Sequence, residues 1–219
     1  NTLWAYATMG ERPGAGVVEV LESRLRAVAG ESNAQDIANT LWAASCLAIG
    51  SPHVLRDLAG ALGERLPSSD MSQVTDTSRC QLHQVFLSCS LDAQLRESLP
   101  ESILSLKDRL GDACRAAFVE AGAQVTESKL QKDVSQALQR MGLAVEEEYR
   151  CPKSGYSIDL RVRVRKSTEE GSSEAQGWAV EADGPSHFLS CKSPTGATLI
   201  KRRHLELLGY NLVSVPYWE

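Results

Sequence analysis

The sequence lacks three features that would identify common classes of protein. No stretch approaches the about 18 consecutive apolar residues of a membrane-spanning helix, so we expect no membrane insertion. None of the six cysteines forms a Cys-x-x-Cys pair, and no Cys/His cluster has zinc-site spacing. We therefore expect reduced, mostly buried thiols in a reducing compartment. An excess of basic charge is also missing: the net charge of -5 argues against indiscriminate nucleic-acid binding.

The acidic excess is confined to one half of the chain. Residues 1–124 carry 10 Lys and Arg against 15 Asp and Glu, whereas residues 125–219 carry 13 of each. The C-terminal half is therefore less repulsive to phosphate. The sequence begins with Asn1 inside a patterned segment, so we expect a fragment in which no targeting peptide would be seen.

An internal repeat dominates the N-terminal half. The segment NTLWA at residues 1–5 returns at 39–43, an offset of 38 residues. VVEVLESRL at 17–25 matches VLRDLAGAL at 54–62 in its apolar positions, and SILSLKDRL at 102–110 is a weaker copy. The helical spacing of these apolar residues predicts two amphipathic helices in each unit.

Helical pairs of this kind bury their apolar faces only by stacking, so residues 1–122 are predicted to form a short α-solenoid. The segment QLHQVFLSC at 81–89 is the degraded first helix of the third unit, and 111–122 is predicted as one more helix. The period and the NTLWA start resemble octotricopeptide repeats, the helical-pair repeats of organellar RNA factors. The resemblance covers about residues 1–110.

The pattern changes from residue 123 onward and predicts a second, α/β domain over 123–219. The expected elements are a helix at 126–142, strands at 144–149, 157–165 and 177–183, a helix at 197–208 and a strand at 211–217. A flexible hairpin loop is expected at 166–177. A helix before three successive strands, then a crossover to a fourth, argues for an α/β sandwich.

Carboxylates are expected to gather at one end of this sheet. Strict alternation places Asp159 on the polar face of its strand, while Glu181 and Asp183 share one face of the next strand. If the two strands pair as a hairpin, the three like charges raise one another's pKa. A divalent cation could compensate, and so could Arg161 or Lys201.

The C-terminal segments VEADGPSHF (180–188) and TGATLIKRRHLELLGYNLVSVPYWE (195–219) resemble the RAP domain, named as an RNA-binding domain. The shared residues are Glu181, Asp183, Gly184, Pro185, His187, Phe188, Lys201, Arg202, Arg203, Leu208, Gly209, Tyr210, Val215, Pro216 and Trp218. Helical repeats followed by a RAP domain are a familiar arrangement. The RAP domain in turn resembles the PD-(D/E)XK nuclease fold, especially its very-short-patch repair type.

That resemblance implies candidate catalytic roles. Asp159 and Glu181 would be the metal carboxylates, for Mg²⁺ or Mn²⁺, and Asp183 stands where the catalytic lysine would be. Lys201 could supply the missing cation, and His187 could be a general base or a structural residue. The departure from the Glu-x-Lys pattern favours a domain without catalysis, for which no cofactor is expected.

Two groups of cations are candidate phosphate ligands. They are Lys201, Arg202 and Arg203 of the predicted last helix, and Arg161, Arg163 and Arg165 of the predicted second strand. The alternatives are a solvated helix face for the first group, and salt bridges to Glu169, Glu170 or Glu174 for the second. His204 is predicted to lie on the packed face of its helix.

Three functions follow from these observations. The first is an RNA-binding factor of a mitochondrion or chloroplast, acting in RNA maturation, stability or translation, with single-stranded RNA on the helices and backbone gripped by the RAP domain. The second is a structural subunit of an organellar complex such as the mitochondrial ribosome, contacting ribosomal RNA and protein subunits, which suits the acidic helical half. The third is a metal-dependent endoribonuclease.

Overall fold

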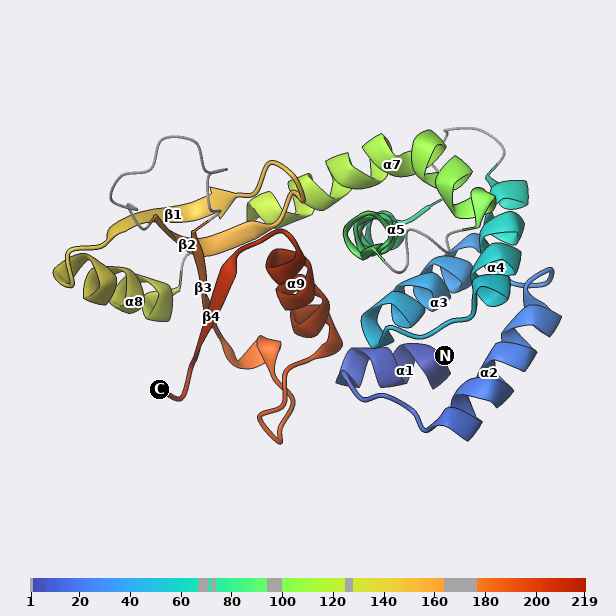
Figure 1. Cartoon of the computed structure of the whole chain (residues 1–219), viewed down its shortest axis with the longest axis horizontal. Coiled ribbons are helices and arrows are strands. Elements are labelled where there is room, and N and C mark those ends of the chain that lie inside the picture. Colours follow the sequence, from blue (N-terminus) through green and yellow to red (C-terminus); the bar gives the residue numbers. More distant parts are fainter. Residues whose placement is uncertain (1, 67–70, 72–73, 94–99, 125–127, 164–176) are drawn as a thin grey trace.

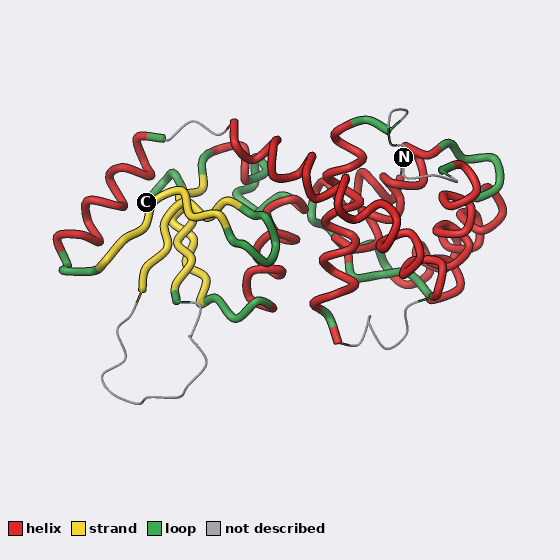
Figure 2. The backbone as a smooth tube through the Cα atoms, turned by 90° about the horizontal axis from the view of Figure 1, so that it is seen from above, coloured by secondary structure: helices red, strands yellow, loops and turns green. Residues whose placement is uncertain are grey.

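The computed structural model describes residues 2–66, 71, 74–93, 100–124, 128–163 and 177–219. A helical half and a smaller half built on one sheet lie side by side (Figures 1 and 2). The predicted class, a helical region followed by an α/β region, is confirmed. No helix among these residues is long and apolar enough to cross a membrane.

Within the described residues, the helical half contains three helical pairs, and the predicted helical units are therefore present. They are α1 (Thr2–Met9) with α2 (Ala15–Val28), α3 (Ala34–Leu47) with α4 (Pro52–Arg65), and α5 (Asp76–Leu91) with α7 (Glu101–Ala121). The first helices α1, α3 and α5 contact one another in order, and so do the second helices α2, α4 and α7. The side chains of Asn33, Ser51 and Thr75 cap the starts of α3, α4 and α5 by accepting a backbone N–H.

The separate helix predicted at 111–122 is wrong, because α7 runs without a break to Ala121. Ile103, Leu106, Leu110 and Cys114 are all buried along one continuous face. A glycine inside a helix costs about 1 kcal/mol. Burial of that face outweighs the penalty at Gly111.

The C-terminal half has the predicted element order. It comprises α8 (Lys129–Arg140), β1 (Ala144–Arg150), β2 (Ser157–Arg163), β3 (Trp178–Asp183), α9 (Gly196–Leu207) and β4 (Asn211–Pro216). The strands lie in the order β1-β2-β3-β4; the first two pairings are antiparallel and β3 pairs with β4 in parallel. Helix α8 covers one face of the sheet and α9 lies on the other side, toward the helical half (Figure 1). Most of the predicted hairpin loop lies outside the described residues.

The hydrophobic cores of the two halves interlock. Ile200 of α9 packs within the core of the helical half, while Leu87 of α5 packs with Ile158, Ala179 and Leu205 of the C-terminal half. The domain boundary between residues 122 and 123 stays a prediction. Helix α9 contributes side chains to the hydrophobic cores of both halves.

Candidate functional site

The carboxylates of β3 are buried, because α9 crosses the face that carries them. Glu181 and Asp183 are 3% and 2% exposed. The alternation correctly places both on one face, but this face is covered, and β3 is buried from Ala179 to Asp183. The start of α9 is fixed by Thr195, whose side chain accepts the N–H of Thr198.

Glu181 forms an ion pair with Lys201 of α9, with 2.5 Å between Nζ and Oε2. Asp159 lies nearby, with its Oδ2 accepting the N–H of Ala182 at 2.8 Å. Burial raises the pKa of Glu181 to about 7, against the opposing effect of Lys201. Burial likewise raises the pKa of Asp159. Burial alone would lower the pKa of Lys201, but the Glu181 and Asp159 carboxylates outweigh it and raise this pKa.

Asp183 is held by three side chains. The Arg202 guanidinium lies 2.7 Å from its Oδ2, and the hydroxyl of Ser214 donates to the same oxygen at 2.5 Å. His187 Nδ1 lies 3.3 Å from Oδ1, and its side chain is 40% exposed. The structure therefore brings the predicted carboxylates, Lys201 and His187 to one end of the sheet.

The predicted metal carboxylates are only partly occupied by protein groups, since Glu181 Oε1 is buried without a hydrogen-bond partner in the part of the chain that the structure describes. The Lys201 ammonium occupies one oxygen of Glu181, and Arg202, Ser214 and His187 engage both oxygens of Asp183. Oxygens held by cationic side chains are not available to Mg²⁺, which demands several oxygen ligands in octahedral geometry. Among the described residues, no three His, Cys, Asp or Glu side chains form a metal-binding group. The catalytic and metal assignments stay predictions.

Arg203 points in another direction and serves the fold. Its Nη1 donates to the carbonyl of Cys46 at 3.2 Å, and its Nη2 donates to the carbonyl of Ser45. These carbonyls lie in the last turn of α3, where the helix dipole favours a cation. The predicted row of three phosphate ligands is therefore split among Glu181, Asp183 and the end of α3.

The arginines Arg161 and Arg163 of β2 pair with an acid of the neighbouring strand β1, a partner that was not predicted for them. Arg161 Nη1 lies 3.6 Å and Arg163 Nη2 lies 3.1 Å from the same oxygen of Glu146 on the neighbouring strand. The Arg161 guanidinium also lies 4.2 Å from the centre of the Tyr149 ring. The Arg163 side chain is 64% exposed, so it remains accessible to a phosphate. Arg165, and the three acids first considered as partners, lie outside the described residues.

An uncharged hydrogen-bond chain joins the two halves, and the sequence analysis missed it. Trp42 Nε1 donates to Gln84, and Gln84 Nε2 donates to the hydroxyl of Tyr156. The imidazole of His204 lies between Tyr156, at 3.0 Å, and Ser88, at 2.7 Å. His204 is fully buried, which confirms its predicted packed position. Burial lowers the pKa of His204 to about 3, so the imidazole is neutral.

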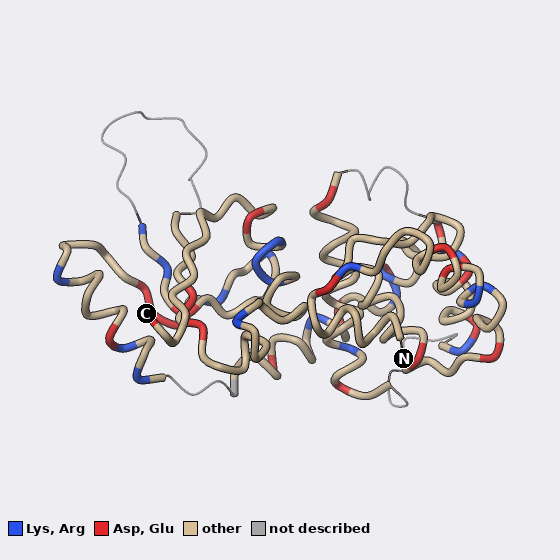
Figure 3. Tube along the Cα trace, turned by 90° about the horizontal axis from the view of Figure 1, so that it is seen from below, with Lys and Arg blue, Asp and Glu red and all other residues tan. Residues whose placement is uncertain are grey.

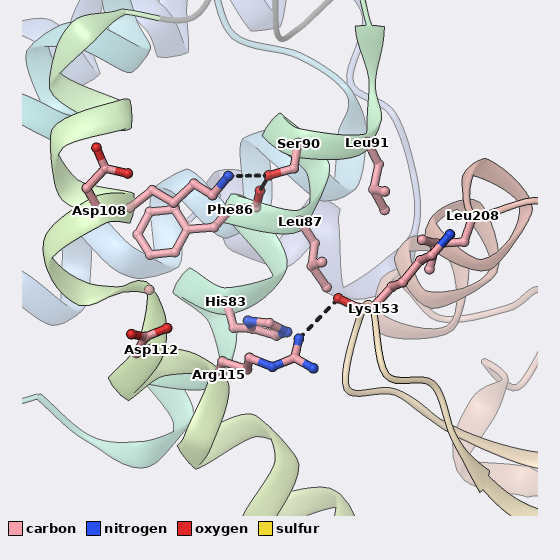
Figure 4. A pocket seen from close by; sticks show the side chains of 12 residues that line it. His83, Phe86, Leu87, Ser90, Leu91, Asp108, Asp112, Arg115, Lys153 and Leu208 are labelled. Carbon is pink, nitrogen blue, oxygen red and sulfur yellow. Dashed lines mark hydrogen bonds between the residues drawn. The ribbon is translucent and has the colours of Figure 1, made fainter.

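A cavity of about 480 Å³ lies elsewhere along the same junction. Figure 4 shows Arg115 at its wall, where it donates to the carbonyl of Lys153. Lys107 also lines the cavity, and its ammonium donates to the hydroxyl of Ser90. Asp108 and Asp112 also line it. None of its lining residues belongs to the carboxylate cluster, so this hollow is separate from the predicted chemistry.

The comparison with known families concerns the segment that forms this site. Residues 180–219 match the RAP domain. The matched segment contains the end of β3, all of α9 and all of β4, and hence every ion pair of the cluster. Asp159 lies before it.

One relative supports the same assignment. A protein of Oryza sativa subsp. japonica, described as "RAP domain-containing protein, chloroplastic", is 34% identical over 93 residues. The aligned region is 42% of this chain and 12% of the rice protein. The chain therefore corresponds to a small part of that relative.

Proposed function

We propose that this protein is an organellar RNA-binding factor whose RAP domain holds RNA without cutting it, in RNA maturation, stability or translation. The observation that carries the proposal is the Lys201–Glu181 ion pair within the segment that matches the RAP domain. The Lys201 ammonium neutralises one oxygen of Glu181, which is one of the two predicted metal carboxylates. The name of the rice relative favours the chloroplast.

The finer resemblances belong to the same proposal. The helical pairs would be octotricopeptide-like repeats, whose surface would carry single-stranded RNA. The four-stranded sheet between α8 and α9 would be a nuclease-like fold retained for binding. Figure 3 shows acidic and basic residues interspersed along the helical half, so base contacts must contribute to affinity there.

A second candidate is a structural subunit of an organellar ribonucleoprotein. The acidic excess of residues 1–124 favours it, because an acidic surface suits protein contacts better than free RNA. Sedimentation of the native protein from organelle extract, with and without ribonuclease, separates the two. A small particle that shrinks on ribonuclease treatment supports an RNA factor, whereas ribosome-sized particles support a structural subunit.

Catalysis is tested with purified protein and end-labelled single-stranded RNA in Mg²⁺ or Mn²⁺. We expect the RNA to be retained at full length, and Glu181→Ala and Glu146→Ala variants to leave its length unchanged. Cleavage that is lost in Glu181→Ala and Asp159→Ala, but kept in Glu146→Ala, would show that the domain is a nuclease.

A further inference from the structure

Three aromatic rings form a cluster at the end of the sheet where β3 and β4 finish. Trp218 meets Phe188 edge-on with 4.5 Å between ring centres, and meets Tyr217 edge-on at 4.9 Å. Tyr217 and Trp218 are 47% and 36% exposed. Soluble proteins bury most large aromatic rings, so adjoining rings left in solvent indicate a contact surface.

The loop that carries Phe188 is firmly held. Phe188 and Pro194 form an isolated β-bridge, and the N–H of Leu189 donates to the carbonyl of Ser193 at 2.8 Å. A Cβ added at Gly10, after α1, would lie 2.9 Å from the carbonyl oxygen of Pro194, so the helical half supports this loop from behind. The rings are therefore presented on a rigid base.

Lys192, at the tip of the loop, extends the cluster. Its backbone has φ +66°, a left-handed conformation that glycine adopts more easily than lysine. The strain is matched by a specific contact: its ammonium lies 4.9 Å from the centre of the Trp218 ring. The Arg202 guanidinium lies 6.0 Å from the centre of the Phe188 ring.

We propose that Tyr217, Trp218 and Phe188 form a stacking site for an unpaired RNA base, with Lys192 placed to contact the adjoining phosphate. This inference rests on the proposed RNA binding and names where one nucleotide is held. Aromatic rings bordered by cations are how proteins hold single-stranded nucleic acid, since every base has a flat face and is joined to an anion.

Other occupants fit less well. A cationic side chain fits less well, because the Lys192 ammonium over Trp218 would repel it, whereas the same charge attracts the phosphate of a nucleotide. The exposed Glu219 beside the rings repels phosphate, so stacking has to supply most of the local affinity. Three rings are also too small an area for a stable protein interface, which buries about 1,200 Å² or more in total.

The test compares two tryptophans of similar exposure in the same half. Trp178 is 41% exposed and begins β3, whereas Trp218 follows the end of the parallel strand β4, roughly 16 Å or more away along the strands. We measure binding of the full chain to a fluorescein-labelled single-stranded RNA of about 12 nucleotides. Trp218→Ala should weaken binding by about fivefold to a hundredfold, Trp218→Phe much less, and Trp178→Ala not at all.

A lysine variant tests the phosphate contact without risk to folding. Lys192→Gly relieves the left-handed strain, so its melting temperature should not fall, while the salt dependence of RNA binding should lose about 0.7 of a unit in log–log slope.

The outcomes separate the two proposals. Wild-type RNA binding that is equally strong in Trp218→Ala and Trp178→Ala would overturn the stacking site and leave RNA binding intact. If the wild-type protein binds no RNA, the proposed function fails, and this inference fails with it. Release of a protein partner by Trp218→Ala, with no change in RNA binding, would likewise overturn the stacking site.

Discussion

The two sides of α9 hold polar groups in opposite ways. Toward the sheet, Lys201 and Arg202 form ion pairs with the buried carboxylates Glu181 and Asp183. Toward the helical half, His204 is neutral and joins a chain of uncharged hydrogen bonds. One helix thus forms ion pairs on one side and, on the other, hydrogen bonds to uncharged groups, which include the α3 carbonyls bound by Arg203.

The two sides of α9 therefore differ in how firmly they can be assigned to stabilising the fold. The hydrogen-bond chain through His204 contains only uncharged groups, so it joins the two halves at little electrostatic cost. Buried ion pairs carry a large desolvation penalty and are weak evidence for stability, so the charged side of α9 is the less certain contributor to the fold. The ion-paired side also lies next to the exposed aromatic cluster and His187.

The largest effect is expected where α9 touches α1. A Cβ on Gly196 would lie 1.6 Å from the carbonyl oxygen of Ala7, which is backbone and has little freedom to move. Gly196→Ala should therefore lower the free energy of unfolding by about 3 kcal/mol or more. Gly16→Ala is the matched control, since Gly16 also lies in the first turn of a helix but has no atom within 4 Å. Equal urea midpoints for the two variants would contradict this contact.

On the charged side, Lys201→Met should leave Glu181 buried without its cation. We expect a loss of about 2 kcal/mol at pH 7, less than for most buried pairs because Glu181, with a pKa of about 7, can take up a proton. The loss should shrink as the pH falls, since a protonated Glu181 needs no partner. Adding Glu181→Gln should restore stability. Urea titrations of the single and double variants at pH 5 and pH 8 measure this, and a loss that grows toward acid pH would disprove the assignment.

The sequence was sufficient to predict the elements, because each carries its own period. The apolar spacing of the helical pairs and the alternation of Ile158, Leu160 and Val162 are local signals, and both are confirmed. The separate helix predicted at 111–122 failed because one buried face continues along α7 from Ile103 to Cys114.

The sequence was sufficient to predict which residues gather at the site, but not which partner each of them contacts. Alternation placed Glu181 and Asp183 on one face. The groups that Lys201, Arg202 and Arg203 contact depend instead on the angle at which α9 packs between the sheet and the helical half. The partners of Arg203 are backbone carbonyls 157 and 158 residues away along the chain. The junction partners of His204 are likewise distant, and one of them, Ser88, carries no sequence signal. Contacts between residues so far apart in the chain produce no periodic pattern in the sequence.

The uncharged junction should be sensitive to acid. His204 has a pKa of about 3 in the folded protein, below the usual 6.5, so the unfolded chain binds the proton more tightly. Its contribution is fully present above pH 6.5 and is lost as the pH falls toward 3, at up to about 1.4 kcal/mol per pH unit. His204→Gln should reduce the pH dependence of the unfolding free energy between pH 6 and 4. His53→Gln, at an exposed position, is the matched control, and a reduction as large as that of His204→Gln would contradict the assignment.

The smallest effect separates fold from binding at Arg203. Because both of its amino groups bond to carbonyls at the end of α3, Arg203→Ala should cost about 1 kcal/mol in unfolding free energy. The salt dependence of RNA binding should stay the same, because this guanidinium is already engaged within the protein. Arg163→Ala is the counterpart: its exposed side chain contributes little to stability, and its loss should reduce the slope by about 0.7 if it contacts a phosphate. A reduced slope in Arg203→Ala would instead mean that the row of three cations meets RNA together, and that the contact with α3 opens when RNA binds.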